Sequence, residues 1–67
     1  MRLLDIVFHL LRKGSKITMN ELAEYFNVSI KTIQRDLDKL SVVGIPLIIH
    51  RGKNGGVEID RSYNISR

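Results

Sequence analysis

Apolar residues recur along the first part of the chain at the spacing of an amphipathic helix. The residues of this apolar stripe are Leu3, Leu4, Ile6, Val7, Leu10 and Leu11. An α-helix completes one turn in 3.6 residues, so positions three or four apart share a face that can pack on a core. We therefore predict a first helix that ends at Gly14. Phe8 falls at the margin of the stripe, where it can face the C-terminal tail or a partner instead of the core.

Two further helices are predicted in close succession. Thr18 and Glu21 have the spacing of a capping box, in which each side chain accepts a hydrogen bond from the other residue's amide, so a short helix begins near Met19. Its apolar stripe consists of Leu22, Ala23 and Phe26. Asn27 tolerates the left-handed conformation that ends a helix, and Ser29 is a good N-cap for the next helix. The pattern therefore predicts a helix-turn-helix with a turn of about three residues.

The third helix is predicted over residues 30–42. Its inner face would consist of Ile30, Ile33, Leu37 and Leu40. The opposite face would carry Lys31, Arg35 and Asp38. Gly44 is expected to end this helix, and Pro46 excludes its continuation because the residue before a proline avoids helical geometry.

The last part of the chain has the composition of a β-hairpin. Residues 47–51 and 57–60 are short runs rich in β-branched residues, which favour strands. A glycine-rich loop with one lysine separates them at residues 52–56. The sequence therefore predicts an α+β fold of three helices followed by a two-stranded hairpin. We expect one domain at residues 1–60, with residues 61–67 as a tail or linker.

Composition and charge narrow the classes of function. The 67 residues include no cysteine, so neither a disulfide nor a thiolate zinc site can support the fold, and packing alone must hold it. The net charge of +4 favours a polyanionic partner, and seven of the 11 basic residues lie after residue 27. Asp5 and His9 interrupt the first apolar run, which lacks a signal-peptide cleavage site. We therefore expect a cytoplasmic protein that does not span a membrane.

The sequence contains no recognisable pattern for catalysis or metal binding. His9 and His50 are its only histidines, and neither has a second ligand at the spacing of a metal site. No nucleophile is paired with a general base. We therefore expect a protein that is not an enzyme and that needs neither a cofactor nor a metal.

The segment 28–40 combines the features of a helix that reads a DNA groove: an N-cap serine, a buried apolar stripe and an exposed polar face. Gln34 can pair with adenine and Arg35 with guanine, while shorter or cationic side chains more readily hold phosphates. The hairpin adds donors on a glycine-rich backbone that can approach phosphate closely. The candidate DNA contacts are Ser29, Lys31, Thr32, Gln34, Arg35 and Lys39 in the helix, and His50, Arg51 and Lys53 in the hairpin.

These motifs resemble the N-terminal winged helix-turn-helix domains (HTH type 11) of DeoR-like and WYL-domain bacterial transcription regulators and, more distantly, the biotin-operon repressor. The resemblance covers residues 3–59. It rests on the string VSIKTIQRDLDKL followed by a glycine, a proline-containing strand and a Gly-Gly hairpin tip.

The resemblance implies that Arg35 contacts DNA, that Asp36 is a structural partner beside it, and that the hairpin wing touches the backbone or minor groove. The family often has an aromatic residue where Val57 stands, so aromatic packing in the wing is in doubt. An effector-sensing or oligomerising domain would follow residue 67.

The sequence thus predicts specific binding of double-stranded DNA by a bacterial transcription regulator, with a possible homodimer on a two-fold operator. RNA binding stays open as an alternative. So does a winged-helix protein-interaction module, whose partner surface would include Phe8, Tyr25 and Tyr63. Exposed polar side chains need no function by themselves. The tight turn before the third helix and the basic hairpin after it are the features that favour DNA.

Overall fold

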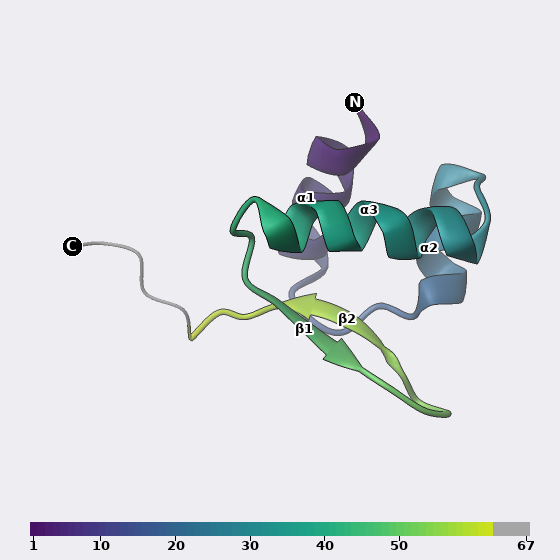
Figure 1. The fold of residues 1–67 in the computed structure, drawn as a ribbon. Coiled ribbons are helices and arrows are strands. Elements are labelled where there is room, and N and C mark those ends of the chain that lie inside the picture. Colours follow the sequence, from purple (N-terminus) through teal and green to yellow (C-terminus); the bar gives the residue numbers. More distant parts are fainter. Residues whose placement is uncertain (63–67) are drawn as a thin grey trace.

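The computed structural model describes residues 1–62 and contains the predicted three helices and hairpin. The helices are α1 (Arg2–Lys13), α2 (Met19–Phe26) and α3 (Ile30–Val42), and the strands are β1 (Leu47–His50) and β2 (Gly56–Ile59). α3 crosses in front of α1, and the hairpin runs below α3 (Figure 1). This arrangement is a winged helix-turn-helix, in which the hairpin is the wing. No helix within residues 1–62 is both long and apolar enough to cross a membrane.

The helices begin and end where the local sequence predicts. Gly14 ends α1 with a φ of 72°, a left-handed conformation that glycine adopts without steric cost. The capping box of α2 has both of its bonds, from Glu21 N–H to Thr18 Oγ1 at 3.1 Å and from Thr18 N–H to Glu21 Oε1 at 2.9 Å. Asn27 ends α2 with a φ of 56°, and the Ser29 side chain caps α3. The turn between α2 and α3 is therefore as short as predicted.

The core lies where the three helices meet the hairpin. Its buried apolar side chains are Ile6, Leu10, Ile17, Leu22, Ala23, Ile33, Leu37, Leu40 and Val57. Ile17 lies in the connection between α1 and α2, outside every predicted apolar stripe, and is only 2% exposed. Ile17 and Val57 therefore make the wing a part of the core.

α1 packs on the core through most of the predicted stripe, but not through all of it. Ile6 and Leu10 are fully buried, and α1 packs on α3 and β2 through this side. Leu4 and Leu11 were predicted on the inner stripe, but they are 51% and 43% exposed. Phe8 lies between them along the helix and is 48% exposed. The prediction for Leu4 and Leu11 was wrong because α1 is apolar on both sides, so its periodicity does not reveal which side the other elements cover.

The start of α3 also departs from the predicted inner face. Ile30 is 40% exposed, because it faces an open groove between α3, the start of α2 and the wing. Farther along, Asp36 is 3% exposed and forms an ion pair with Arg2 of α1, not with the neighbouring Arg35. The hydrogen bond to Asp36 raises the pKa of the Arg2 guanidinium above its ordinary value. This pair links the start of α1 to the middle of α3 and compensates a buried charge.

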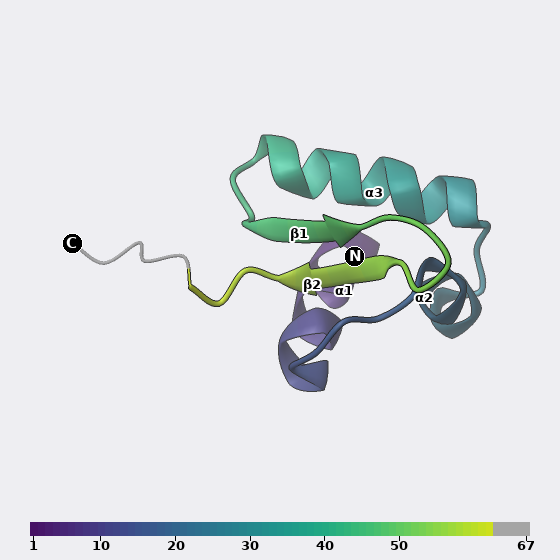
Figure 2. The ribbon, with the colours of Figure 1, turned by 90° about the horizontal axis from the view of Figure 1, so that it is seen from below.

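The wing is an antiparallel pair of strands attached to the connection between α1 and α2. Its register pairs Leu47 with Ile59 and His50 with Gly56. β1 therefore ends one residue earlier than predicted, and β2 begins and ends one residue earlier than predicted. Ile17 adds an isolated bridge to Val57, with N–H···O distances of 2.9 and 2.8 Å in the two directions. Figure 2 shows β1 on the side of α3 and β2 on the side of this connection. The bridge fixes the base of the wing against the helices.

Candidate nucleic-acid interface

The exposed face of α3 carries most of the predicted contact residues. Its exposed polar side chains include Lys31, Gln34, Arg35 and Lys39. The opposite face of the same helix contributes Ile33, Leu37 and Leu40 to the core. Because the apolar face is held in the core, the polar face of α3 points to solvent along the helix.

Two of the predicted contacts, Ser29 and Thr32, are joined by the N-cap hydrogen bonds of α3. The Ser29 hydroxyl accepts a hydrogen bond from Thr32 N–H at 3.1 Å and donates one to Thr32 Oγ1 at 3.0 Å. The Thr32 hydroxyl therefore keeps its own proton for another acceptor. These hydroxyls lie at the positive end of the helix dipole, where an anion such as phosphate is stabilised.

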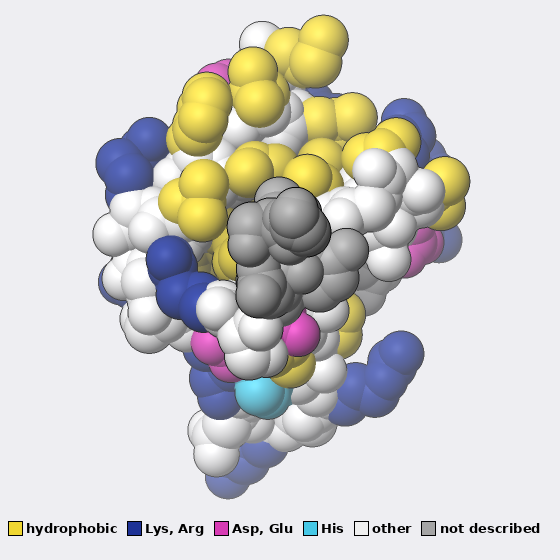
Figure 3. Space-filling view, turned by 90° about the vertical axis from the view of Figure 1, so that its left-hand side faces the viewer, with side chains coloured by type: hydrophobic (Ala, Val, Ile, Leu, Met, Phe, Trp, Pro, Cys, Tyr) yellow, Lys and Arg dark blue, Asp and Glu magenta, His cyan; other side chains and the backbone are white. Residues whose placement is uncertain are grey.

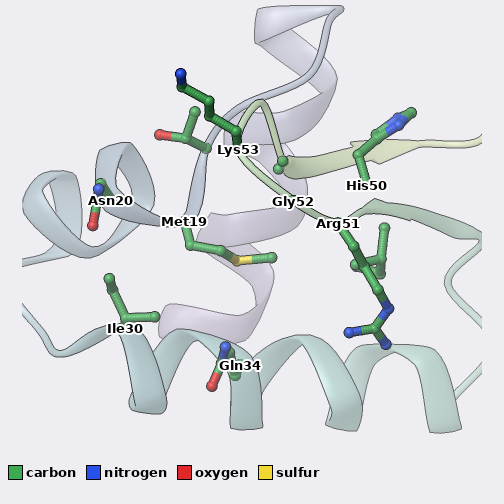
Figure 4. Close-up of a pocket in the computed structure, with 12 residues that line it drawn as sticks. Met19, Asn20, Ile30, Gln34, His50, Arg51, Gly52 and Lys53 are labelled. Carbon is green, nitrogen blue, oxygen red and sulfur yellow. The ribbon is translucent and has the colours of Figure 1, made fainter.

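A groove of about 390 Å³ lies between the start of α3, the start of α2 and the wing. Its polar lining residues include Thr18, Asn20, Gln34, Arg51 and Lys53. Its apolar lining residues include Met19, Ile30 and Ile49. In Figure 4, Arg51 reaches from the wing toward α3, while Gln34 faces the groove from α3 itself. The fold therefore brings predicted contacts from the helix and from the wing to one groove.

The other predicted contacts on α3 do not line this groove. Ser29 is the N-cap of α3, and Lys31, Thr32, Arg35 and Lys39 belong to the helix itself, outside the groove. Arg35 and Lys39 are four residues apart and so share one side of the helix. A partner that spans both the groove and the open face of α3 could reach all of them together.

His50 is one of the residues that line the groove, but its ring is bonded within the wing. Figure 4 shows its ring on the opposite side of the strand from the Arg51 side chain, as expected for neighbouring residues of a strand. Its Nε2 atom lies 2.6 Å from Glu58 Oε2 on β2. The structure therefore joins the His50 ring to the other strand of the wing, while His50 lines the same groove as Arg51 and Lys53.

Contacts that sequence reasoning missed hold the wing in place. Lys16 Nζ donates a hydrogen bond to the carbonyl oxygen of Asn54 at 2.5 Å, although the two residues are 38 positions apart. Thr18 and Asn20 were also missed as lining residues. The capping box, which marks the start of α2, was a signal that could have located these two. No sequence signal relates Lys16 to the wing.

An aromatic pair outside the groove joins α1 to α2. The His9 ring stacks on Tyr25 with 4.1 Å between the ring centroids. Burial lowers the pKa of His9, and two nearby cations on α1 lower it further. Tyr25 is 60% exposed, but the His9 ring covers one of its faces. Tyr63, the other tyrosine of the predicted interaction surface, lies outside the described residues.

Three features define a winged helix-turn-helix domain. They are the short turn between α2 and α3, the exposed polar face of α3, and the basic wing beside that helix. A family model described as an HTH domain matches residues 2–58, and the chain belongs to this family. This match confirms the resemblance inferred from the sequence.

The chain is also 39% identical over 66 residues to YobV of Bacillus subtilis (strain 168), named as an uncharacterized HTH-type transcriptional regulator. The alignment covers 98% of this chain but 21% of the relative, so the chain spans about a fifth of the relative's length. No solved structure matches the chain significantly.

Proposed function

We propose that this domain binds double-stranded DNA and recognises its sequence. α3 would enter the major groove, where Gln34 and Arg35 would contact base edges. The wing would lie on the backbone or in the minor groove through Arg51 and Lys53. The observation that carries this proposal is the groove that Gln34 of α3 shares with Arg51 and Lys53 of the wing.

The remaining predicted contacts would fix the position of the domain on the duplex. Ser29, Lys31 and Thr32 lie in or beside the first turn of α3, where hydroxyls, a cation and the helix dipole favour phosphate. Lys39 would reach the backbone farther along the same helix. His50 is joined to Glu58, so we propose that it stabilises the wing instead of contacting DNA.

We further propose that the domain is the DNA-reading part of a bacterial transcription regulator. The relative YobV carries such a regulator's name, and this chain matches about a fifth of its length. In a longer regulator, other domains would sense an effector in the cytoplasm. Two reading domains would bind the two halves of a symmetric operator.

Replacing Arg35 by alanine tests the role of α3. We expect binding to the preferred duplex, selected from random DNA, to weaken by about 1–3 kcal/mol, or roughly 5- to 150-fold in Kd. The reason is that a bidentate contact to guanine would be lost. Fluorescence anisotropy titrations at fixed salt measure the change.

Lys13→Ala is the matched control for Arg35→Ala, because it removes the same charge from α1, outside the groove. It should weaken binding far less and leave the preferred sequence unchanged. Equal Kd values for Arg35→Ala and the wild type would contradict the proposed role of α3. Tighter binding to RNA than to duplex DNA at the same salt would favour the RNA-binding alternative.

Replacing Lys53 by alanine tests the wing. If Lys53 neutralises one phosphate, the slope of log K against log salt should become shallower by about one unit. The selected sequence should stay the same, since a phosphate contact carries no base information. An unchanged slope, measured by titration at several salt concentrations, would remove Lys53 from the interface.

A further inference from the structure

α1 has a second apolar face that leaves a line of large side chains exposed. Leu4, Phe8 and Leu11 are spaced at i, i+4 and i+7, and we call them the outer stripe. They are 51%, 48% and 43% exposed, while Ile6 and Leu10 are buried on the other side of the helix. Figure 3 shows hydrophobic side chains gathered on one side of the molecule. Such contiguous exposure is typical of an interaction surface.

Two opposite charges flank the outer stripe. Asp5 and Arg12 are seven residues apart, so they lie on one edge of the helix about 10 Å from each other. Both residues are exposed. Asp5 makes only a long contact of 3.9 Å with the N-terminal amine, and Arg12 has no ion pair within residues 1–62. Both charges are therefore free to meet a partner.

We propose that the outer stripe is a dimer interface at which α1 packs antiparallel on α1 of a second copy of this chain. A two-fold axis midway between residues 8 and 9 would place Asp5 of each copy opposite Arg12 of the other. The same axis brings the two Phe8 side chains together and sets Leu4 beside Leu11 of the second copy.

The charge pattern selects a second copy as the occupant. A different protein would need an apolar stripe of its own and opposite charges at the same spacing, whereas α1 supplies all of these for itself. A contact through one helix face buries little area, and interfaces of this size are weak. We therefore expect a reversible dimer with a Kd on the order of 100 µM.

This interface would join the two halves of the DNA-bound dimer in the proposed function, without blocking the groove. None of the residues of the outer stripe lines the groove between α3 and the wing. Self-association can be measured without DNA. A negative result would therefore leave the DNA-binding proposal standing, and a failure of DNA binding would leave this one standing.

Charge-exchange variants of the 67-residue chain, measured by sedimentation equilibrium, test the proposal. Asp5→Arg alone, or Arg12→Asp alone, should weaken the dimer at least tenfold, because each variant sets like charges opposite each other twice per dimer. The double variant D5R/R12D should restore association, since it exchanges the two charges and keeps the net charge. Thermal melts confirm that each variant is folded.

Phe8→Ser should also weaken association. Ile49→Ser is the matched control, because Ile49 lies on the wing and is 43% exposed, close to the 48% of Phe8. A chain that stays monomeric up to about 1 mM would overturn the proposal and assign the outer stripe to another part of a longer regulator or to another protein. Dimerisation that depends on Phe8 but is not restored in D5R/R12D would overturn the antiparallel arrangement.

Discussion

Replacing Ile17 by alanine is expected to remove most of the domain's free energy of unfolding. The Ile17 side chain is 2% exposed and lies in the core beside Val57 of the wing. Truncation of a buried isoleucine to alanine costs about 2–5 kcal/mol, since it removes apolar contacts and leaves a cavity. A domain of this size without disulfides has a total stability of only about 3–5 kcal/mol. Urea unfolding followed by circular dichroism measures the loss.

Ile49→Ala provides the control for Ile17→Ala. Ile49 has the same side chain, but it is 43% exposed on β1, so its truncation should cost roughly 1 kcal/mol or less. Equal losses of stability in the two variants would mean that the connection between α1 and α2 does not hold the wing to the core.

Gly56→Ala is expected to have the second largest effect, and it acts through the same junction. A Cβ atom on Gly56 would lie 2.5 Å from the backbone oxygen of Ile17, and the φ of 155° is one that side-chain-bearing residues rarely adopt. Relief requires the backbone to move, yet the adjacent Val57 exchanges two backbone hydrogen bonds with Ile17. We expect a loss of about 2–4 kcal/mol, which combines backbone strain with overpacking.

Gly44→Ala separates these two contributions. Gly44 also has a positive φ, of 102°, but a Cβ atom there would meet nothing within 4 Å. It should therefore show the strain without the clash, and a smaller loss of stability in thermal unfolding. A Gly56→Ala variant as stable as Gly44→Ala would contradict the close approach of the wing to residue 17.

In the folded fraction of Gly56→Ala, the salt dependence of DNA binding should fall if the displaced wing loses its phosphate contact.

Local signals in the sequence were sufficient to predict the secondary structure and the exposed polar face of α3. Thr18 with Glu21, Asn27 and Ser29 act on backbone groups within four residues, so their hydrogen bonds do not depend on the rest of the fold. The polar face of α3 was predictable for a related reason. A helix that buries Ile33 and Leu37 turns Gln34 and Arg35 to solvent, although Asp36 is buried beside them.

The sequence pattern was ambiguous where a residue's environment is made by distant segments. α1 is apolar on two sides, so periodicity alone placed Leu4 and Leu11 wrongly in the core. Neighbouring residues of the wing also differ in role. Arg51 faces α3, whereas the His50 ring is joined to Glu58, and the strand register decides between these directions.

The sequence by itself determined the three helices, their caps, the tight turn and the basic hairpin, because these depend on spacings of a few residues. Only the tertiary structure decided which side of α1 is buried, that Asp36 pairs with Arg2, and that the wing is held by Lys16 and Ile17. Those contacts join residues 34 to 40 positions apart, and they form only when the helices and the hairpin pack on a common core. The groove between α3 and the wing exists for the same reason.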